Sequence, residues 1–247
     1  MVSFRQEINP LFNNIKKALI LIAIFFWYAG CTEKIPATHL VFVDYSLSTP
    51  IFIKGNSNRL LDQIKQSLKQ MNAGDRMVVY PIHLASSTAA PIIRFIKPLP
   101  NGDLNDRNNA MKENNNFIQV LKGILIEPGI RRNIRLKTNI YPIIHKINRY
   151  VNEGPVFVKI FSDMKHEFSN ENFDELFGPL KKDPDTYAKE IFELINPKPL
   201  LSNCAIKILI PGLSEGEMED ELIRNNIILF WEKLFRLTGS KVNIQDL

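Results

Sequence analysis

Residues 38–48 read Thr-His-Leu-Val-Phe-Val-Asp-Tyr-Ser-Leu-Ser, an apolar run that ends in an acidic residue and two serines. The run Thr38–Val43 is rich in β-branched and aromatic side chains, which predicts a strand buried in a sheet. Asp44, Ser46 and Ser48 follow at the point where this strand leaves the sheet. Because ligands bind beyond the carboxyl ends of parallel strands, this segment is the first candidate for a binding site.

The rest of the chain alternates between strand and helix patterns. This alternation predicts an α/β fold, Rossmann-like and doubly wound, with a mostly parallel central sheet, one antiparallel edge hairpin and helices on both faces. Pro81 predicts an edge strand or a strand end, and the Asn- and Asp-rich residues 98–116 predict a polar loop. Further strands are expected at 77–82, 92–96, 155–161, 204–210 and 241–244, and helices at 57–72, 117–126, 140–151, 187–194 and 219–237.

The N-terminus has the layout of an export signal. Lys16 and Lys17 precede Ala18–Gly30, an apolar run of 13 residues, which is too short for a helix to cross a ~30 Å hydrocarbon core comfortably. The ending Ala-Gly-Cys resembles a bacterial lipobox, which implies that Cys31 is lipidated and becomes the first mature residue. Tyr28 stands where that motif usually has Leu, Val or Ile, so an uncleaved anchor and a buried helix remain alternatives.

These observations divide the chain into three parts. Residues 1–31 are expected to form a signal peptide or membrane anchor, residues 32–37 a short tether, and residues 38–247 one folded domain. Lipidation and an uncleaved anchor both predict a domain held at a membrane outside the cytoplasm. Cys204 opens an apolar run and is expected to be a small buried residue rather than a disulfide partner of Cys31.

Two further polar residues belong with Asp44, Ser46 and Ser48. Asp163 follows a later strand, and Thr138 precedes a helix, for which it is also a candidate N-cap. The five side chains offer two carboxylates and three hydroxyls, which are the hard oxygen donors that Mg²⁺ requires. Because two carboxylates only balance the charge of a divalent cation, such a site leaves the metal able to accept a carboxylate from outside.

Asp-x-Ser-x-Ser after the first strand, a Thr in a middle loop and an Asp after a later strand resemble the metal-ion-dependent adhesion site of von Willebrand factor A domains. The resemblance covers residues 38–246. It implies direct metal ligation by Ser46 and Ser48, with Asp44, Thr138 and Asp163 binding directly or through water. Met164 stands where that family often has Gly. The expected function is therefore Mg²⁺- or Mn²⁺-dependent binding of a protein that supplies an acidic residue.

Two other functions remain open. A metal-dependent phosphatase or nuclease would use Asp44 and Asp163, although such enzymes usually have more carboxylates. A non-metal scaffold would keep the polar residues only as loop braces. The chain contains no zinc motif or phosphate loop, and no enzymatic activity is expected. The net charge of +5 is too small and too dispersed to indicate nucleic-acid binding.

Overall fold

The apolar run that opens the domain forms β1 (Thr38–Asp44), in the interior of a six-stranded sheet with the order β3-β2-β1-β4-β5-β6. The computed structural model describes residues 35–46, 49, 54–83, 86–98, 104–126, 138–165, 183–196, 201–211 and 221–247. The other strands are β2 (Arg76–Ile82), β3 (Ile93–Ile96), β4 (Val156–Phe161), β5 (Cys204–Ile210) and β6 (Lys241–Asp246), and the helices are α2 (Lys54–Gln70), α3 (Leu104–Ile126), α4 (Pro142–Asn148), α6 (Pro184–Ile195) and α7 (Glu221–Leu237).

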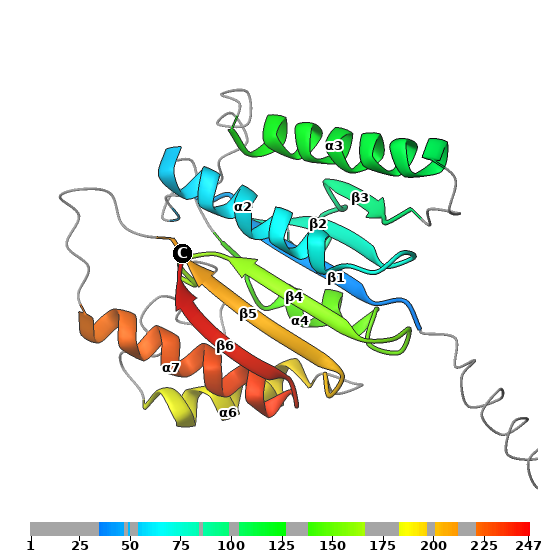
Figure 1. Cartoon of the computed structure of the whole chain (residues 1–247). Coiled ribbons are helices and arrows are strands. Elements are labelled where there is room, and N and C mark those ends of the chain that lie inside the picture. Colours follow the sequence, from blue (N-terminus) through cyan, green and yellow to red (C-terminus); the bar gives the residue numbers. More distant parts are fainter. Residues whose placement is uncertain are drawn as a thin grey trace, which may run out of the picture. The chain divides into compact units, whose positions relative to one another are not determined.

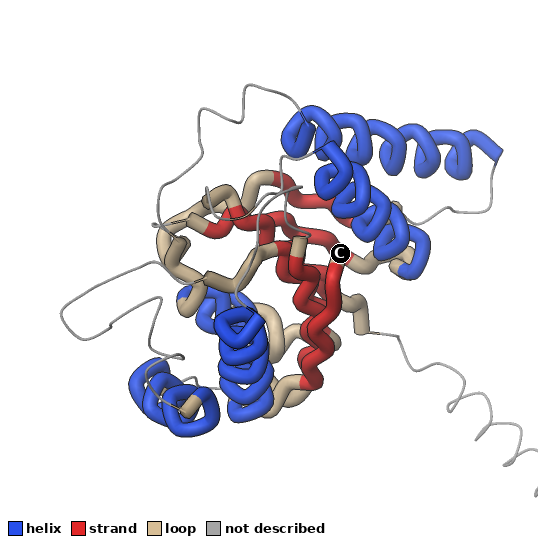
Figure 2. The backbone as a smooth tube through the Cα atoms, turned by 90° about the vertical axis from the view of Figure 1, so that its left-hand side faces the viewer, coloured by secondary structure: helices blue, strands red, loops and turns tan. Residues whose placement is uncertain are grey.

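The sheet is parallel except at one edge. β1 pairs in parallel with β2 and β4, β5 pairs in parallel with β4 and β6, and β3 pairs antiparallel with β2. Helices lie on both faces, as Figures 1 and 2 show. The predicted fold, a Rossmann-like, mostly parallel sheet with one antiparallel edge hairpin, is therefore confirmed.

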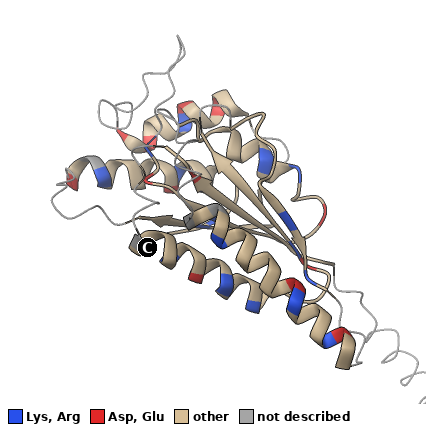
Figure 3. Ribbon diagram, turned by 90° about the horizontal axis from the view of Figure 1, so that it is seen from above, with Lys and Arg blue, Asp and Glu red and all other residues tan. Residues whose placement is uncertain are grey.

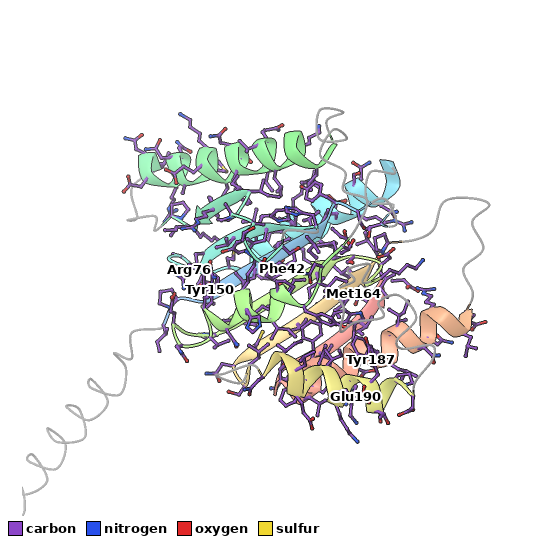
Figure 4. All side chains as sticks on the ribbon, turned by 180° about the vertical axis from the view of Figure 1, so that it is seen from behind. Phe42, Arg76, Tyr150, Met164, Tyr187 and Glu190 are labelled. Atoms are coloured by element: carbon purple, nitrogen blue, oxygen red, sulfur yellow. The ribbon has the colours of Figure 1, made fainter. Side chains whose placement is uncertain are left out.

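Alternate residues of β1 pack into two separate cores. Leu40 and Phe42 belong to the core beneath α4, α6 and α7, and Figure 4 shows Phe42 on that side of the sheet. Val41 and Val43 belong to the core beneath α2 and α3. Because successive strand residues point to opposite faces, an uninterrupted apolar run is required for a strand that is covered on both sides.

Helix α3 is longer than the sequence indicates. Residues 98–116 were expected to form a polar loop, but the helix begins at Leu104. Leu104 and Met111 remain exposed, whereas Phe117, Leu121 and Leu125 are buried against α2. Only the carboxyl half of α3 therefore shows the apolar spacing that marks a helix in a sequence.

Pro81 is the next-to-last residue of β2, which is an interior strand, so of the two expected places the strand end is confirmed and the sheet edge is not. β3 pairs with β2 only from Arg76 to Val79, and Pro81 lies beyond that ladder. On the other side of β2, Pro81 is in register with Val43. Because proline lacks an N–H donor, it is tolerated here near the strand end, where the antiparallel ladder has already stopped.

The chain divides into two structural units, Met1–Ile35 and Pro36–Leu247, and the helices and strands above belong to the second. In the described residues, no helix is both long enough and apolar enough to cross a membrane. Cys204 is a free, buried thiol, as expected. Burial raises its pKa to about 12. Cys31 and the apolar segment before it lie outside the described residues.

Candidate functional site

The carboxyl ends of β1 and β4 lie next to each other. The two strands are parallel neighbours, with Val43 in register with Phe161. Asp44 is the last residue of β1, and Ser162 and Asp163 directly follow β4. The prediction that the strand ending at Asp44 neighbours the strand leading to Asp163 is therefore confirmed.

Asp44 is completely buried and is held by hydrogen bonds from two loops. Its Oδ1 accepts a bond of 2.8 Å from the backbone N–H of Ser46, and its Oδ2 accepts a bond of 2.5 Å from the hydroxyl of Ser162. Burial raises the pKa of Asp44, and the Ser162 hydroxyl and the Ser46 amide oppose that rise. In the described part of the chain, no basic side chain forms an ion pair with this carboxyl group.

Thr49 connects the two halves of the site. The hydroxyl of Ser46 donates to Thr49 Oγ1 over 3.2 Å, and the backbone N–H of Asp163 donates to the same oxygen over 3.4 Å. The hydroxyl of Thr49 also contributes to lowering the pKa of Asp44. Thr49 therefore holds the Asp44 loop and the Asp163 loop against each other.

The peptide after Asp163 has an unusual conformation. Met164 has a φ of 61°, in the left-handed region that favours glycine. Its backbone N–H donates to the Ser162 hydroxyl over 2.9 Å, and its carbonyl accepts a bond of 2.8 Å from the indole N–H of Trp231. Glycine would adopt this conformation without steric cost, whereas a residue with a Cβ adopts it only when its surroundings hold it there.

Asp163 is buried like Asp44, although the residue as a whole keeps 8% of its exposed area whereas Asp44 keeps none. Its Oδ1 accepts a bond of 3.0 Å from the backbone N–H of Lys165. The other carboxyl oxygen of Asp163, Oδ2, is buried, so both carboxyl groups lie inside the site.

Thr138 is fully buried and does not cap a helix. The N-cap of α4 is Tyr141, with no capping side-chain bond, so the predicted capping role of Thr138 is wrong, and α4 itself is shorter than the expected helix. In α4 the N–H groups of Ile143 and Ile144 instead bond the carbonyls of Ile140 and Tyr141. The Thr138 hydroxyl has no hydrogen-bond partner among the residues that the structure describes.

Trp231 connects the Thr138 loop to the Asp163 loop. The ring of Tyr141, three residues after Thr138, lies 5.5 Å from the ring of Trp231, measured between centroids. The same indole bonds the Met164 carbonyl. Figure 4 shows Met164 at the carboxyl end of the sheet. Both loops therefore pack against one side chain of α7.

The structure describes four of the five predicted site residues: Asp44, Ser46, Thr138 and Asp163. Ser48 lies outside the described residues. The sequence did not single out Thr49 and Ser162, which bond to Asp44 or to its neighbours. The only feature of the sequence that could have pointed to them is their position, because Thr49 directly follows Ser48 and Ser162 directly precedes Asp163.

Oxygen atoms of hydroxyls dominate this site. Within the described ranges, no group of three or more His, Cys, Asp or Glu side chains comes together. The two carboxylates and the surrounding hydroxyls of Ser46, Thr49 and Ser162 are hard donors. Such a set suits a cation that favours oxygen ligands and does not suit a soft metal. The buried hydroxyl of Thr138, which has no hydrogen-bond partner among the described residues, could also serve as an oxygen ligand.

No protein-family model matches the chain, and no curated protein matches it. A von Willebrand factor type A structure from Catenulispora acidiphila aligns with 12% identity over 85% of this chain and 38% of its own, at a TM-score of 0.42. The open form of the pilus adhesin SpaC from Lactobacillus rhamnosus GG aligns with 11% identity over 86% of this chain and 28% of its own, at 0.44.

Manganese-loaded TRAP protein of Plasmodium vivax aligns with 12% identity over 86% of this chain and 69% of its own, at a TM-score of 0.35. The chain spans less than half the length of the first two structures. These similarities are weak and say nothing about ligand, partner or activity. The strand order, the single antiparallel pair and the two helix layers are those of the Rossmann-like α/β fold expected from the sequence.

Proposed function

We propose that the protein binds Mg²⁺ or Mn²⁺ through Asp44, Ser46, Ser48, Thr138 and Asp163. The observation that carries this proposal is the hydroxyl of Thr138, which is buried and has no hydrogen-bond partner in the described part of the chain. A buried hydroxyl without a partner costs free energy. Metal ligation would recover that cost and would give Thr138 a role that helix capping does not.

The environment of Asp44 supports the same proposal. A buried carboxylate disfavours its charged form unless a positive charge or hydrogen bonds offset the loss of water. At Asp44 the described offsets are hydroxyl and amide donors, and burial still raises the pKa. A divalent cation would supply the missing positive charge and would keep Asp44 ionised.

The partner that such a site would hold is a protein with an exposed Asp or Glu. The two carboxylates would only balance the charge of the cation, and the other protein donors would be neutral hydroxyls, so the cation would still accept a carboxylate from outside. The cation would supply a Lewis-acid position for one further carboxylate oxygen. Ser46, Thr49 and Ser162 would orient the protein donors around it. The proposed activity is therefore adhesion or assembly, without catalysis.

The N-terminal residues would hold this domain at a membrane, outside the cytoplasm. Lipidation of Cys31 is one route, and an uncleaved apolar segment is the other. The support is the sequence pattern alone. If Cys31 is the attachment point, Cys31→Ser prevents maturation and changes the migration of the protein on a gel. Unchanged migration and unchanged membrane association would favour the uncleaved anchor.

The metal site is tested by calorimetric titration of the full chain with Mg²⁺ and Mn²⁺. Saturable binding should be lost in Asp44→Asn and retained in Asp75→Asn. Asp75 is a matched control because it is also buried and hydrogen-bonded, but it precedes β2 at the opposite end of the sheet. Folded wild-type protein that binds neither metal at millimolar concentration would refute the proposal.

The partner interaction is tested separately. A captured partner should dissociate in EDTA and should fail to bind folded Asp44→Asn. Equal binding in EDTA and to that variant would instead identify a scaffold that uses the site only as a loop brace. Metal-dependent release of phosphate from a generic ester, lost in Asp44→Asn, would identify the hydrolase alternative.

A further inference from the structure

Among the residues that the structure describes, no helix covers one half of the sheet on the side where α2 and α3 lie. In Figure 1 no helix crosses in front of β4, β5 and β6, whereas α4, α6 and α7 lie on the other side. The core beneath α2 and α3 takes only Phe161 from β4 and Leu209 from β5, both near the carboxyl ends. Parallel sheets are normally covered on both faces, so this exposure requires an explanation.

The uncovered surface consists of two rows of side chains that cross the three strands. Their neighbours along the strands, Val158, Ile206 and Val242, face the core beneath α4, α6 and α7. Because side chains alternate along a strand, the residues of the two rows point to the other side of the sheet. All six are exposed or half-buried. We call this surface the open face; its rows are Phe157, Ala205 and Lys241, and Lys159, Lys207 and Asn243.

The open face is basic. Neighbouring strands lie about 4.8 Å apart, so three lysines meet within a small area. Burial, and then the charge of Lys207, lower the pKa of Lys159 to about 8. The strands supply no compensating carboxylate in the described residues, because Asp246 pairs instead with Arg224 of α7 on the opposite side. Figure 3 shows basic positions on the strands themselves as well as on the helices.

The same surface carries an apolar anchor. Phe157 is 46% exposed although it lies in an interior strand. Its ring stacks on that of His39, with 5.0 Å between centroids and 28° between the planes. Ala205 lies beside it in register. A large aromatic side chain flanked by a small residue and by positive charges offers both apolar contact and charge to a ligand.

α2 forms one wall of the open face. Lys159 donates to the carbonyl of Gln63 over 2.9 Å and reaches its side-chain oxygen at 3.4 Å. Arg59, one helical turn earlier, donates to the carbonyl of Leu247 after β6. This wall is polar and adds one more positive charge. A rod-shaped ligand would lie beside α2 and complete the helix layer on this side.

We propose that the open face docks an acidic amphipathic helix of a partner protein, with its apolar residues on Phe157 and Ala205 and its carboxylates over Lys159, Lys207 and Lys241. A helix is favoured because helices are the usual cover of a parallel sheet. Acidic side chains are favoured because the surface presents three ammonium groups. The open face lies on the side of the sheet, and the proposed metal site lies at its carboxyl edge, so the two sites bind independently.

The test uses the full chain in a neutral detergent and a fluorescein-labelled helical peptide of Leu, Ala and Glu, about 18 residues long. Binding is followed by fluorescence anisotropy in EDTA, which separates this site from the metal site. Affinity should fall with added salt. It should weaken by about tenfold or more in Lys159→Gln/Lys207→Gln/Lys241→Gln. The control Lys112→Gln/Lys122→Gln/Lys189→Gln makes the same change in net charge at exposed helix positions and should bind as the wild type does.

Two further measurements guard against a folding artefact. The single variants Lys207→Glu and Phe157→Ser should each weaken binding while circular dichroism remains native. Hydrogen exchange should show that the peptide protects β5 and β6. Binding that survives the open-face triple variant overturns the proposal. Two other results would also overturn it. The first is that the chain binds no peptide but floats with phosphatidylglycerol vesicles, and that this flotation is lost in the open-face triple variant. The second is that the chain associates with itself through this face.

Discussion

The hydroxyl of Ser162 donates a 2.5 Å hydrogen bond to Oδ2 of Asp44 and joins two residues that lie 118 positions apart in the chain. The same hydroxyl accepts the N–H of Met164. Ser162 therefore fixes the buried carboxylate and the turn that follows β4 at once. Its effects on stability and on metal affinity should have the same sign.

Ser162→Ala should lower the free energy of unfolding by about 1–3 kcal/mol, because it leaves a buried carboxylate and a buried amide without their partner. Metal affinity should fall as well, since Asp44 becomes easier to protonate and less well oriented. Urea denaturation and metal titration measure the two effects. Ser202→Ala, at an exposed turn before β5, should change neither quantity.

Thr138→Val should separate stability from metal binding. Valine has nearly the same shape as threonine, and it removes a buried hydroxyl that has no partner among the described residues. Without metal, the free energy of unfolding should stay constant or rise by up to about 1 kcal/mol. Affinity for Mn²⁺ should nevertheless decrease. A clear loss of metal-free stability would show that the hydroxyl bonds a protein group instead.

Met164→Gly should change the free energy of unfolding in two opposite ways, through backbone strain and through packing. Glycine would relieve the left-handed conformation, which costs a side-chain-bearing residue about 1–2 kcal/mol. It would also remove a side chain that is only 2% exposed, and loss of a buried methionine side chain costs about 2–5 kcal/mol. Packing is the larger effect, so the variant should be less stable than the wild type. A thermal midpoint above that of the wild type would reverse this ranking.

Stability should rise with pH in the alkaline range because of Lys159. The pKa of this lysine falls from 10.5 to about 8 in the folded protein. Below pH 8 the ammonium is charged in both states, and its burial penalty acts in full. Between pH 8 and 10.5 the folded state releases the proton while the unfolded state keeps it, so folding gains stability. The difference between wild type and Lys159→Gln, followed by urea denaturation from pH 7 to 10.5, isolates this effect.

Strong apolar patterns predicted the fold well. The strand at Cys204–Ile210 has the bounds expected from its sequence. Phe230 and Trp231, both within the expected helix at 219–237, lie in the core. The pattern failed at Leu104, where a helix extends past the core and needs no apolar stripe. At Pro81 the expected strand end is confirmed, and proline is tolerated there because the neighbouring ladder ends first.

The site was less predictable than the fold. Asp44 and Asp163 were found because acidic residues directly follow apolar strands. Ser162 and Thr49 were not, because serine and threonine are common in loops and only the folded geometry shows which hydroxyl meets which carboxylate. The capping role expected for Thr138 was wrong because the chain enters α4 three residues later, at Tyr141.

The central position of β1 governs the order in which the domain can be assembled. β1 emerges first from the ribosome, yet one of its two partners is β4, which is made only after residue 155. Until then Val41 and Val43 have no partner strand on that side, and Asp44 lacks Ser162. Long-range parallel pairing of this kind is slow. The nascent chain therefore exposes an apolar strand edge from the completion of β1 to the completion of β4, which is the period when a chaperone would need to hold it.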